Sequence, residues 1–334
     1  MLKKEYYYSL DLFRGFCGYG VAICHLNAFI FSNQFLEYLS LIFVEFFFVL
    51  SGFVLYPQLL KVIDKKNNLL IFYKRRWMRT LPLYFVILIL VSILTNHLFD
   101  VNFFKYFFLI QKFMPNFIEN DYYPVAWSLS IEELFYLLFP LILVFLNNKN
   151  FLKISLIIFI TIFFIKYSLL DSFDANFYRT GSFLRFDAIL FGFLISHFKS
   201  EVLEYRKIII LFTIIFITFF LLSHDYFVIN KTYPHNRFIF IIFMQLTSGL
   251  TLLSFIFLEP LLKNYYLRKF SLLISQQTYS IYLFHIIIIY IFSMIDLSIY
   301  IITPIYILLL FLISTLIYNF FEKPLLKLRP KIIN

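Results

Sequence analysis

The sequence predicts an all-α, polytopic integral membrane protein with about ten transmembrane helices. Of the 334 residues, 62% are hydrophobic and only 14% are charged, whereas a soluble globular chain is about half apolar and about a quarter charged. Apolar stretches of ~18–25 residues follow one another along the chain, and each is long enough to cross ~30 Å of hydrocarbon. The predicted spans are residues 11–31, 38–60, 81–98, 124–146, 152–170, 181–198, 207–222, 237–258, 275–293 and 299–321.

The segments before and between these spans indicate a single membrane domain. Two lysines precede the first span, but Asp11 and Arg14 interrupt its apolar run and no small-residue cleavage site follows, so we expect an uncleaved span rather than a signal peptide. Residues 101–113 are apolar but too short to cross the membrane, and are expected to be interfacial or re-entrant. No repeat or soluble segment is visible, so residues 1–334 are predicted to form one domain.

The distribution of basic residues predicts that both termini are cytoplasmic. If the N-terminus is placed inside, 21 of the 29 Lys and Arg residues fall in inner loops and tails, against 6 in outer loops. Basic loops are retained on the cytoplasmic side of a membrane. The pattern therefore indicates a multi-pass protein of the cytoplasmic membrane, and it explains the formal charge of +10 without a nucleic-acid partner.

Four ionisable residues are predicted to share one layer in the outer half of the membrane. His25, Glu45, Glu132 and His285 lie six to eight residues from the outer ends of four different spans. Ionisable groups inside a span are costly, and they usually mark a functional site. Two histidines and two carboxylates suit acid–base chemistry, so all four are candidate catalytic residues. The structural alternative is that His285 packs between helices and that each carboxylate neutralises an arginine.

A second cluster of charges, all basic, is predicted at the inner face. Arg76 and Arg79 are three residues apart, just before the third span, whose start we expect at Pro82. Arg14 lies at a similar depth, and eleven helical steps of ~100° leave it only ~20° out of register with His25, ~16 Å away along the axis. Guanidinium groups suit phosphate oxygens, so these three arginines are candidate donor-binding residues. Anchoring by positive charge alone is the alternative for Arg76 and Arg79.

Further polar residues are predicted to line the acceptor entrance or to have a structural role. They are Trp127, Ser128, Arg185 and Asp187. An ion pair between Arg185 and Asp187 explains these two charges as well as a site does. Glu133 is not included, because adjacent helical residues point ~100° apart and Glu132 is the one in the predicted layer. No metal site is predicted, since no HxxH, HExxH or Cys–His spacing occurs.

Seven segments carry short motifs in a fixed order. They are SLDLFRGFCGYGVAICH in the first span, VEFFFVLSGF (Val44–Phe53), RWMR (Arg76–Arg79), WSLSIEELFYLLFP (Trp127–Pro140), RFDAILFG (Arg185–Gly192), TYSIYLFH (Thr278–His285) and FEKP (Phe321–Pro324). Together they closely resemble the acyltransferase-3 family of membrane acyltransferases, over nearly the whole chain. The first matches the family's Arg-x10-His signature through Arg14 and His25, and the third matches its Arg-x-x-Arg motif.

The resemblance implies transfer of an acyl group, usually acetyl from acetyl-coenzyme A. The implied acceptor is a hydroxyl of a cell-surface, exported or lipid-linked carbohydrate. No cofactor is implied, because acyl-coenzyme A is the donor substrate. Many relatives carry an appended SGNH-type esterase-like domain, whereas only thirteen residues follow Phe321, so the resemblance is to the membrane part alone.

These observations together suggest a mechanism and one competing class of function. The phosphates of acyl-coenzyme A are expected to dock on the inner arginines, and His25 to remove the proton of the acceptor hydroxyl while Glu45 or Glu132 orients its ring. A covalent acyl intermediate on His25 is the alternative route. The competing class is a transporter or flippase of lipid-linked sugar, in which the same charges would form a substrate or proton path. The absence of a visible inverted repeat counts against that class.

Overall fold

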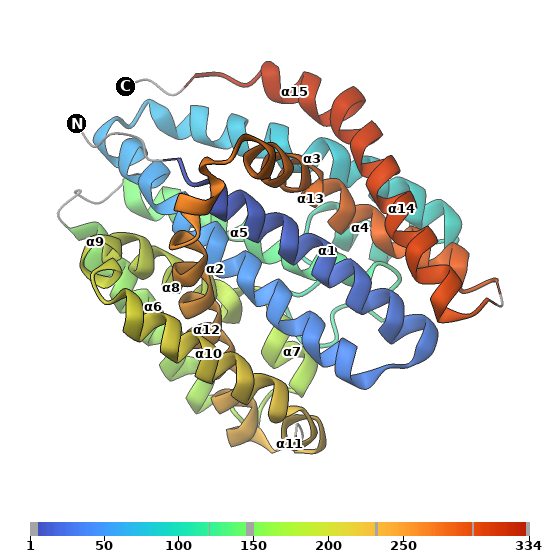
Figure 1. Ribbon diagram of the computed structural model, residues 1–334, viewed down its shortest axis with the longest axis horizontal. Helices are drawn as coiled ribbons and strands as arrows, with labels where there is room; N and C mark the ends of the chain where they lie inside the picture. The colour runs from blue at the N-terminus through green and yellow to red at the C-terminus, as the bar shows by residue number, and fades with distance from the viewer. Residues whose placement is uncertain (1–5, 120, 145–149, 231–232, 296, 332–334) are drawn as a thin grey trace.

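The described chain is helical throughout its regular structure. The computed structural model describes residues 6–119, 121–144, 150–230, 233–295 and 297–331, and no β-strand occurs in these ranges. The helices form one bundle, with α1 between α2 and α13 (Figure 1). The predicted all-α fold is therefore confirmed.

Ten helices lie at the ten predicted spans. They are α1 (Tyr8–Phe31), α2 (Gln34–Asp64), α3 (Asn68–Leu94), α5 (Trp127–Val144), α6 (Phe151–Ser168), α8 (Phe186–His197), α10 (Arg206–Leu222), α12 (Pro234–Ile256), α13 (Tyr265–Phe292) and α14 (Ile299–Ile317). Within the described residues, seven segments are long and apolar enough to cross a membrane, and they correspond to all of these helices except α1, α8 and α10. This confirms a polytopic membrane protein, while the number of spans and the side of the termini stay predictions.

The expectation that the helix of the third span starts at Pro82 is wrong. Helix α3 begins at Asn68, so Arg76 and Arg79 lie inside it, and Pro82 is an interior residue. Lys and Arg are good helix formers, which explains why the helix extends beyond its apolar run toward the basic end. In a membrane helix an interior proline is tolerated because neighbouring groups satisfy the freed backbone. Helix α13 is longer than predicted for the same reason, since it begins at Tyr265 rather than near residue 275.

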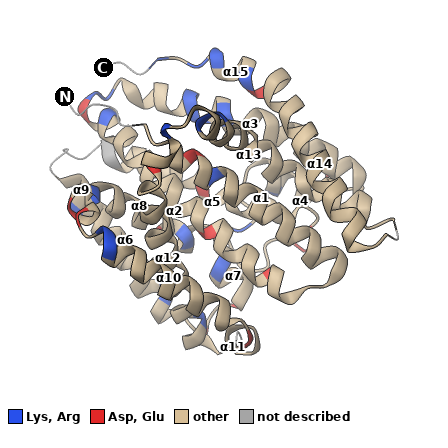
Figure 2. Cartoon of the chain, in the orientation of Figure 1, with Lys and Arg blue, Asp and Glu red and all other residues tan. Residues whose placement is uncertain are grey.

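Short helices complete the two ends of the bundle. At the end where α1 and α2 meet lie α4 (Val101–Phe107), η1 (Pro124–Ala126), α7 (Ala175–Thr180), η3 (Phe183–Arg185) and α11 (His224–Ile229). At the opposite end lie α9 (Lys199–Leu203), η4 (Glu259–Lys263), the π-helical η5 (Tyr318–Glu322) and α15 (Lys323–Lys327). Lys and Arg gather at this second end, around α3, α9, α13 and α15 (Figure 2). The first is called the outer end and the second the inner end, after the predicted topology.

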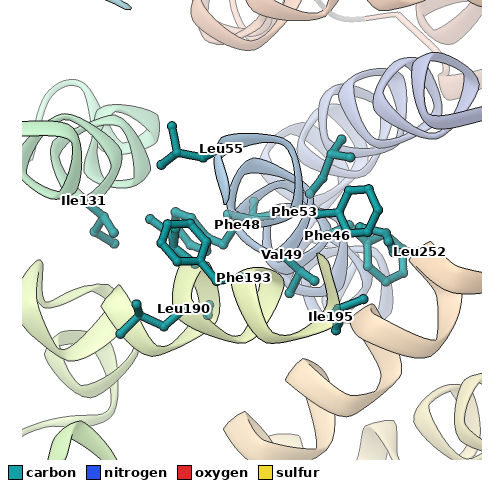
Figure 3. Packing of buried hydrophobic residues seen from close by; sticks show 14 of the residues in the cluster. Phe46, Phe48, Val49, Phe53, Leu55, Ile131, Leu190, Phe193, Ile195 and Leu252 are labelled. Atoms are coloured by element: carbon teal, nitrogen blue, oxygen red, sulfur yellow. The ribbon is translucent and has the colours of Figure 1, made fainter. Parts of the chain in front are cut away.

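Helices α2 and α8 cross at close range. A Cβ atom added to Gly52 would lie 1.9 Å from the carbonyl oxygen of Ile189, and one added to Gly192 would lie 2.2 Å from that of Val49. Small residues let membrane helices approach in this way. Phe48 and other apolar side chains of α2 face those of α8 beside this crossing (Figure 3). The crossing fixes α2 against the helix that follows Arg185.

Candidate active site

Two histidines from opposite ends of the sequence meet in the bundle. His25 on α1 and His285 on α13 are joined by a hydrogen bond of 3.0 Å between Nδ1 of His25 and Nε2 of His285. Their rings are stacked, with centroids 5.2 Å apart and planes 27° apart. His285 is fully buried, whereas His25 is partly exposed. The close packing of α1 on α13 therefore places one accessible imidazole on a buried one.

The hydrogen bonds of His285 determine the tautomer of His25. Nδ1 of His285 lies 3.1 Å from the carbonyl oxygen of Ile281 and 2.8 Å from that of Tyr282. Carbonyl oxygens only accept, so this nitrogen carries the proton and Nε2 of neutral His285 is an acceptor. His25 must then donate from its own Nδ1. Its Nε2 keeps an unshared electron pair, which is the requirement for a general base.

The expectation that a carboxylate orients His25 is corrected by this geometry. Among the described residues the hydrogen-bond partner of His25 is His285. Glu45 instead pairs with Arg185, while Glu132 accepts hydrogen bonds from Ser51 (2.6 Å) and Tyr136 (3.1 Å). The four residues of the predicted layer are thus divided among three sets of partners.

Two ion pairs link α2, α6 and α8 in the interior. Arg185 donates to Glu45, and Lys166 donates to Asp187. All four side chains are almost fully buried, and the charges cancel. Removing one partner of such a pair leaves an uncompensated buried charge, which costs ~3–5 kcal/mol. The Arg185–Asp187 ion pair expected from the sequence is therefore wrong, because each residue pairs with a different partner. Lys166 was one of the six basic residues counted in outer loops, but its side chain is buried in the interior.

Trp127 and Ser128, the candidate acceptor-lining residues, lie next to the histidine pair. Tyr282 donates its hydroxyl proton to the carbonyl oxygen of Val125 over 2.8 Å, so Ser128 must be the donor in its 2.6 Å hydrogen bond with Tyr282. The ring of Tyr282 lies 5.9 Å from that of His285. The start of α5 is thereby tied to α13 at the level of the histidines.

Arg179 is a candidate that the sequence did not single out. Its guanidinium lies 5.0 Å from the centre of the Trp127 ring and interacts electrostatically with His25. No carboxylate within the described ranges lies at salt-bridge distance from Arg179. In the sequence it is one more basic residue of an outer loop, and only the fold of α7 brings it to the histidines.

The three inner arginines interact electrostatically with one another, and their role in donor binding stays a prediction. Arg14 on α1 interacts electrostatically with Arg79 and Arg76 on α3. Arg76 donates to the side-chain oxygen of Gln58 over 3.1 Å and lies 5.0 Å from the centre of the Tyr136 ring. No salt bridge neutralises these three arginines in the described part of the chain. Carboxylates lie close enough to act on them electrostatically, but three guanidinium groups without a salt bridge in the described ranges still suit a polyanionic ligand.

Two residues of the C-terminal segment join this inner cluster. Burial, together with the neighbouring guanidinium groups of Arg79, Arg75 and Arg76, lowers the pKa of Arg329 to about 10. Glu322, in the FEKP motif, is buried and interacts electrostatically with Arg79. It lies in the π-helical η5, and single π-helical turns occur often at functional sites. Neither residue was named as a candidate from the sequence, although Glu322 lies in the FEKP motif.

No group of three or more His, Cys, Asp and Glu side chains is placed to hold a metal ion within the ranges that the structure describes.

Comparison with known proteins gives one family. Residues 7–319 match the family model of an acyltransferase domain. The O-acetyltransferase OatA of Staphylococcus aureus is 28% identical over 378 residues, which cover 98% of this chain and 58% of OatA. An uncharacterized protein of Haemophilus influenzae is 30% identical over 184 residues, which cover 47% of this chain and 75% of that protein. The chain thus spans 58% of the length of OatA. No solved structure matches the chain.

Proposed function

Because the chain belongs to the acyltransferase-3 family of membrane acyltransferases, we propose that it moves an acetyl group from acetyl-coenzyme A to a hydroxyl of a carbohydrate in the cytoplasmic membrane. The observation that carries this proposal is the histidine pair, which leaves Nε2 of His25 free to accept a proton. The relatives named as O-acetyltransferases support a hydroxyl acceptor. A cell-surface or lipid-linked carbohydrate is the acceptor that the family resemblance favours.

The inner arginines are assigned to the donor. Arg14, Arg76 and Arg79 would bind the phosphates of coenzyme A from the cytoplasmic side, since charge-assisted hydrogen bonds to phosphate are strong and suit the planar guanidinium. Arg14 and His25 share α1 and lie ~16 Å apart along its axis. The long, thin arm of coenzyme A would follow this face and bring the thioester to the histidines.

The transfer itself needs one base and one positive charge. Nε2 of His25 takes the proton of the acceptor hydroxyl while the oxygen attacks the thioester carbonyl, and Arg179 stabilises the negative charge that develops on the carbonyl oxygen. The carbon–sulfur bond then breaks, the ester is formed, and the proton on His25 passes to the departing thiolate. His285 is a positioning residue in this scheme, because it holds the tautomer of His25 without touching the acceptor.

Incubation of the purified protein with radiolabelled acetyl-coenzyme A tests the proposal. We expect transfer of label to a carbohydrate acceptor, or slow release of acetate when the acceptor is absent. His25→Ala should slow both by ~10²–10⁴-fold, whereas His235→Ala, at an exposed outer position, should leave both unchanged. A protein that leaves the thioester intact in the presence of membrane extract, yet moves lipid-linked sugar across vesicles, would establish the transporter alternative instead.

A further inference from the structure

Two outer segments line a polar pocket. The lining residues lie at positions 111, 112, 114, 116–119 and 121 of the first segment and at 174, 176, 177 and 180 of the second, and the pocket volume is about 140 Å³. The loops are held together by a backbone hydrogen bond of 3.0 Å from Ser182 to Lys112. Lys112 is also ion-paired with Asp121 at 2.8 Å, within the first loop. The two segments that line the pocket are therefore connected by a hydrogen bond, and the first is further stabilised by its own ion pair.

A buried acceptor group in this pocket lacks a partner. Gln111 is 1% exposed, and its Nε2 donates to the carbonyl oxygen of Ala126 over 2.9 Å. Its side-chain oxygen has no hydrogen-bond donor in the described part of the chain. An unmade hydrogen bond at a buried polar atom costs ~1–3 kcal/mol, so a ligand with a hydroxyl donor would gain by supplying it.

The other lining groups define the chemistry of that ligand. Asn116 and Asn176 offer amides, and Phe117 and Phe177 contribute aromatic surface. Three carboxylates, those of Glu119, Asp121 and Asp174, line the pocket with one lysine, Lys112. This excess of negative charge disfavours an anionic ligand. A cavity of ~150 Å³ holds one six-membered ring such as benzene, and this pocket is of similar size. A neutral ring with several hydroxyl groups fits all of these features.

The pocket is linked to the candidate active site through residues 125–126. Ala126 accepts a hydrogen bond from Gln111, which lines the pocket, and Val125 accepts one from Tyr282, which packs beside His285. Helix α7 contributes to both places, through Phe177 in the pocket and through Arg179 beside Trp127. A ligand anchored in the pocket would thus be held next to the segment that packs on the histidine pair.

We propose that this pocket binds one neutral sugar ring of the acceptor, so that a neighbouring hydroxyl is presented to His25. The inference rests on the proposed function for its role, but the binding itself does not depend on acyl transfer. It assigns acceptor selection to the outer loops, whereas the donor is selected at the inner end.

Binding of methyl glycosides to the purified full chain without acetyl-coenzyme A tests the pocket. Ligand-observed NMR should detect the methyl glycoside of glucose, galactose or N-acetylglucosamine, and should detect the methyl glucuronoside more weakly because the carboxylates repel it. Gln111→Leu should weaken binding about tenfold, the value of one hydrogen bond to a buried group. Asn176→Ala, at an exposed position on the rim, should also weaken binding. This variant tests the proposal if the Gln111 variant fails to fold. Asn230→Ala, on another outer loop, should leave binding unchanged.

A charge-removing variant sharpens the test. Glu119→Gln combined with Asp174→Asn should raise the affinity for the glucuronoside toward that of the neutral glycoside. The pocket proposal is overturned if no neutral glycoside binds, if Gln111→Leu and Asn176→Ala both bind as the parent does, or if the glucuronoside binds as well as the neutral ring. Failure of the proposed function looks different, because glycosides would still bind at the pocket while no thioester is consumed.

Discussion

The side chain of His285 has one proton to donate, and two carbonyl oxygens of its own helix compete for it. This local detail decides which nitrogen of His25 is free, since a neutral imidazole can donate from only one side. The sequence could predict that His25 and His285 share a depth, because depth follows from counting residues along a helix. It could not predict their contact, which depends on how α1 and α13 rotate about their own axes.

The same reason explains the fate of the two carboxylates. Glu45 and Glu132 lie within the long apolar helices α2 and α5, but counting residues along a helix does not reveal which neighbour each helical face meets. Glu45 faces the buried Arg185, and Glu132 faces the serine of its neighbour α2. Arg179 was missed for a different reason. It lies on the six-residue helix α7, which has no apolar run long enough to predict it from the sequence.

Substitutions of the histidine pair should separate the base from its positioning residue. His25→Ala should lower kcat by ~10²–10⁴-fold while binding of coenzyme A is kept, the usual effect of removing a positioned base. His285→Ala should lower kcat by ~10–100-fold with little change in KM, as expected for an outer-shell partner that orients a functional histidine.

Rescue distinguishes positioning from packing at His285. His285→Gln retains a side-chain acceptor and should recover part of kcat, whereas His285→Leu fills similar space and should not. Equal activity of the Gln and Leu variants would show that His285 only fills the interior.

Substitutions of the inner arginines should act on the donor instead. Arg76→Ala with Arg79→Ala should chiefly raise the KM for acetyl-coenzyme A, since each lost charge-assisted contact costs ~1.5–3 kcal/mol. Lysine at both positions should restore membrane yield but only part of the affinity, because an ammonium cannot reproduce the guanidinium fork. Arg75→Ala is the matched control, since Arg75 is engaged with the carbonyl oxygen of Pro330 at 2.6 Å. Complete recovery by lysine would leave positive charge alone as the explanation.

Among the helices, the contact between α2 and α8 is the most constrained. An alanine Cβ at position 52 would meet a backbone oxygen, which cannot move without displacing the helix. Gly52→Ala should therefore lower the free energy of unfolding by ~1–3 kcal/mol or more, seen as a lower Tm in detergent. Gly20→Ala is the control, because its Cβ would meet only the ring of Phe43, whose far end can turn aside. Equal Tm values for the two variants would contradict a tight crossing.

The helices themselves were the most predictable part of the molecule. Each predicted span coincides with a helix because a long apolar run must satisfy its backbone groups internally in lipid. The boundaries were less predictable, as α3 and α13 show. Hydropathy ends where the basic residues begin, whereas the helix continues through them.

At the scale of the whole molecule, the basic inner end predicts a fixed orientation. A cysteine at Lys66 should react with an impermeant thiol reagent only after the cells are opened, whereas one at Asp225 should react in intact cells. Cys17 and Cys24 are buried, so the parent protein should give little background. Labelling of position 66 in intact cells would reverse the topology and remove the argument for donor binding from the cytoplasm.

The hydrogen bond between the histidines has a consequence for biosynthesis. It joins residues 260 positions apart, so a growing chain that has inserted α1 to α12 already carries Arg14, Arg76 and Arg79 but has not yet made His285. Until α13 packs on α1, the ring of His25 lacks the hydrogen-bond acceptor that fixes its tautomer. Under the proposed mechanism, the chain therefore gains its general base only when α13 packs on α1, after the inner arginines are already in place.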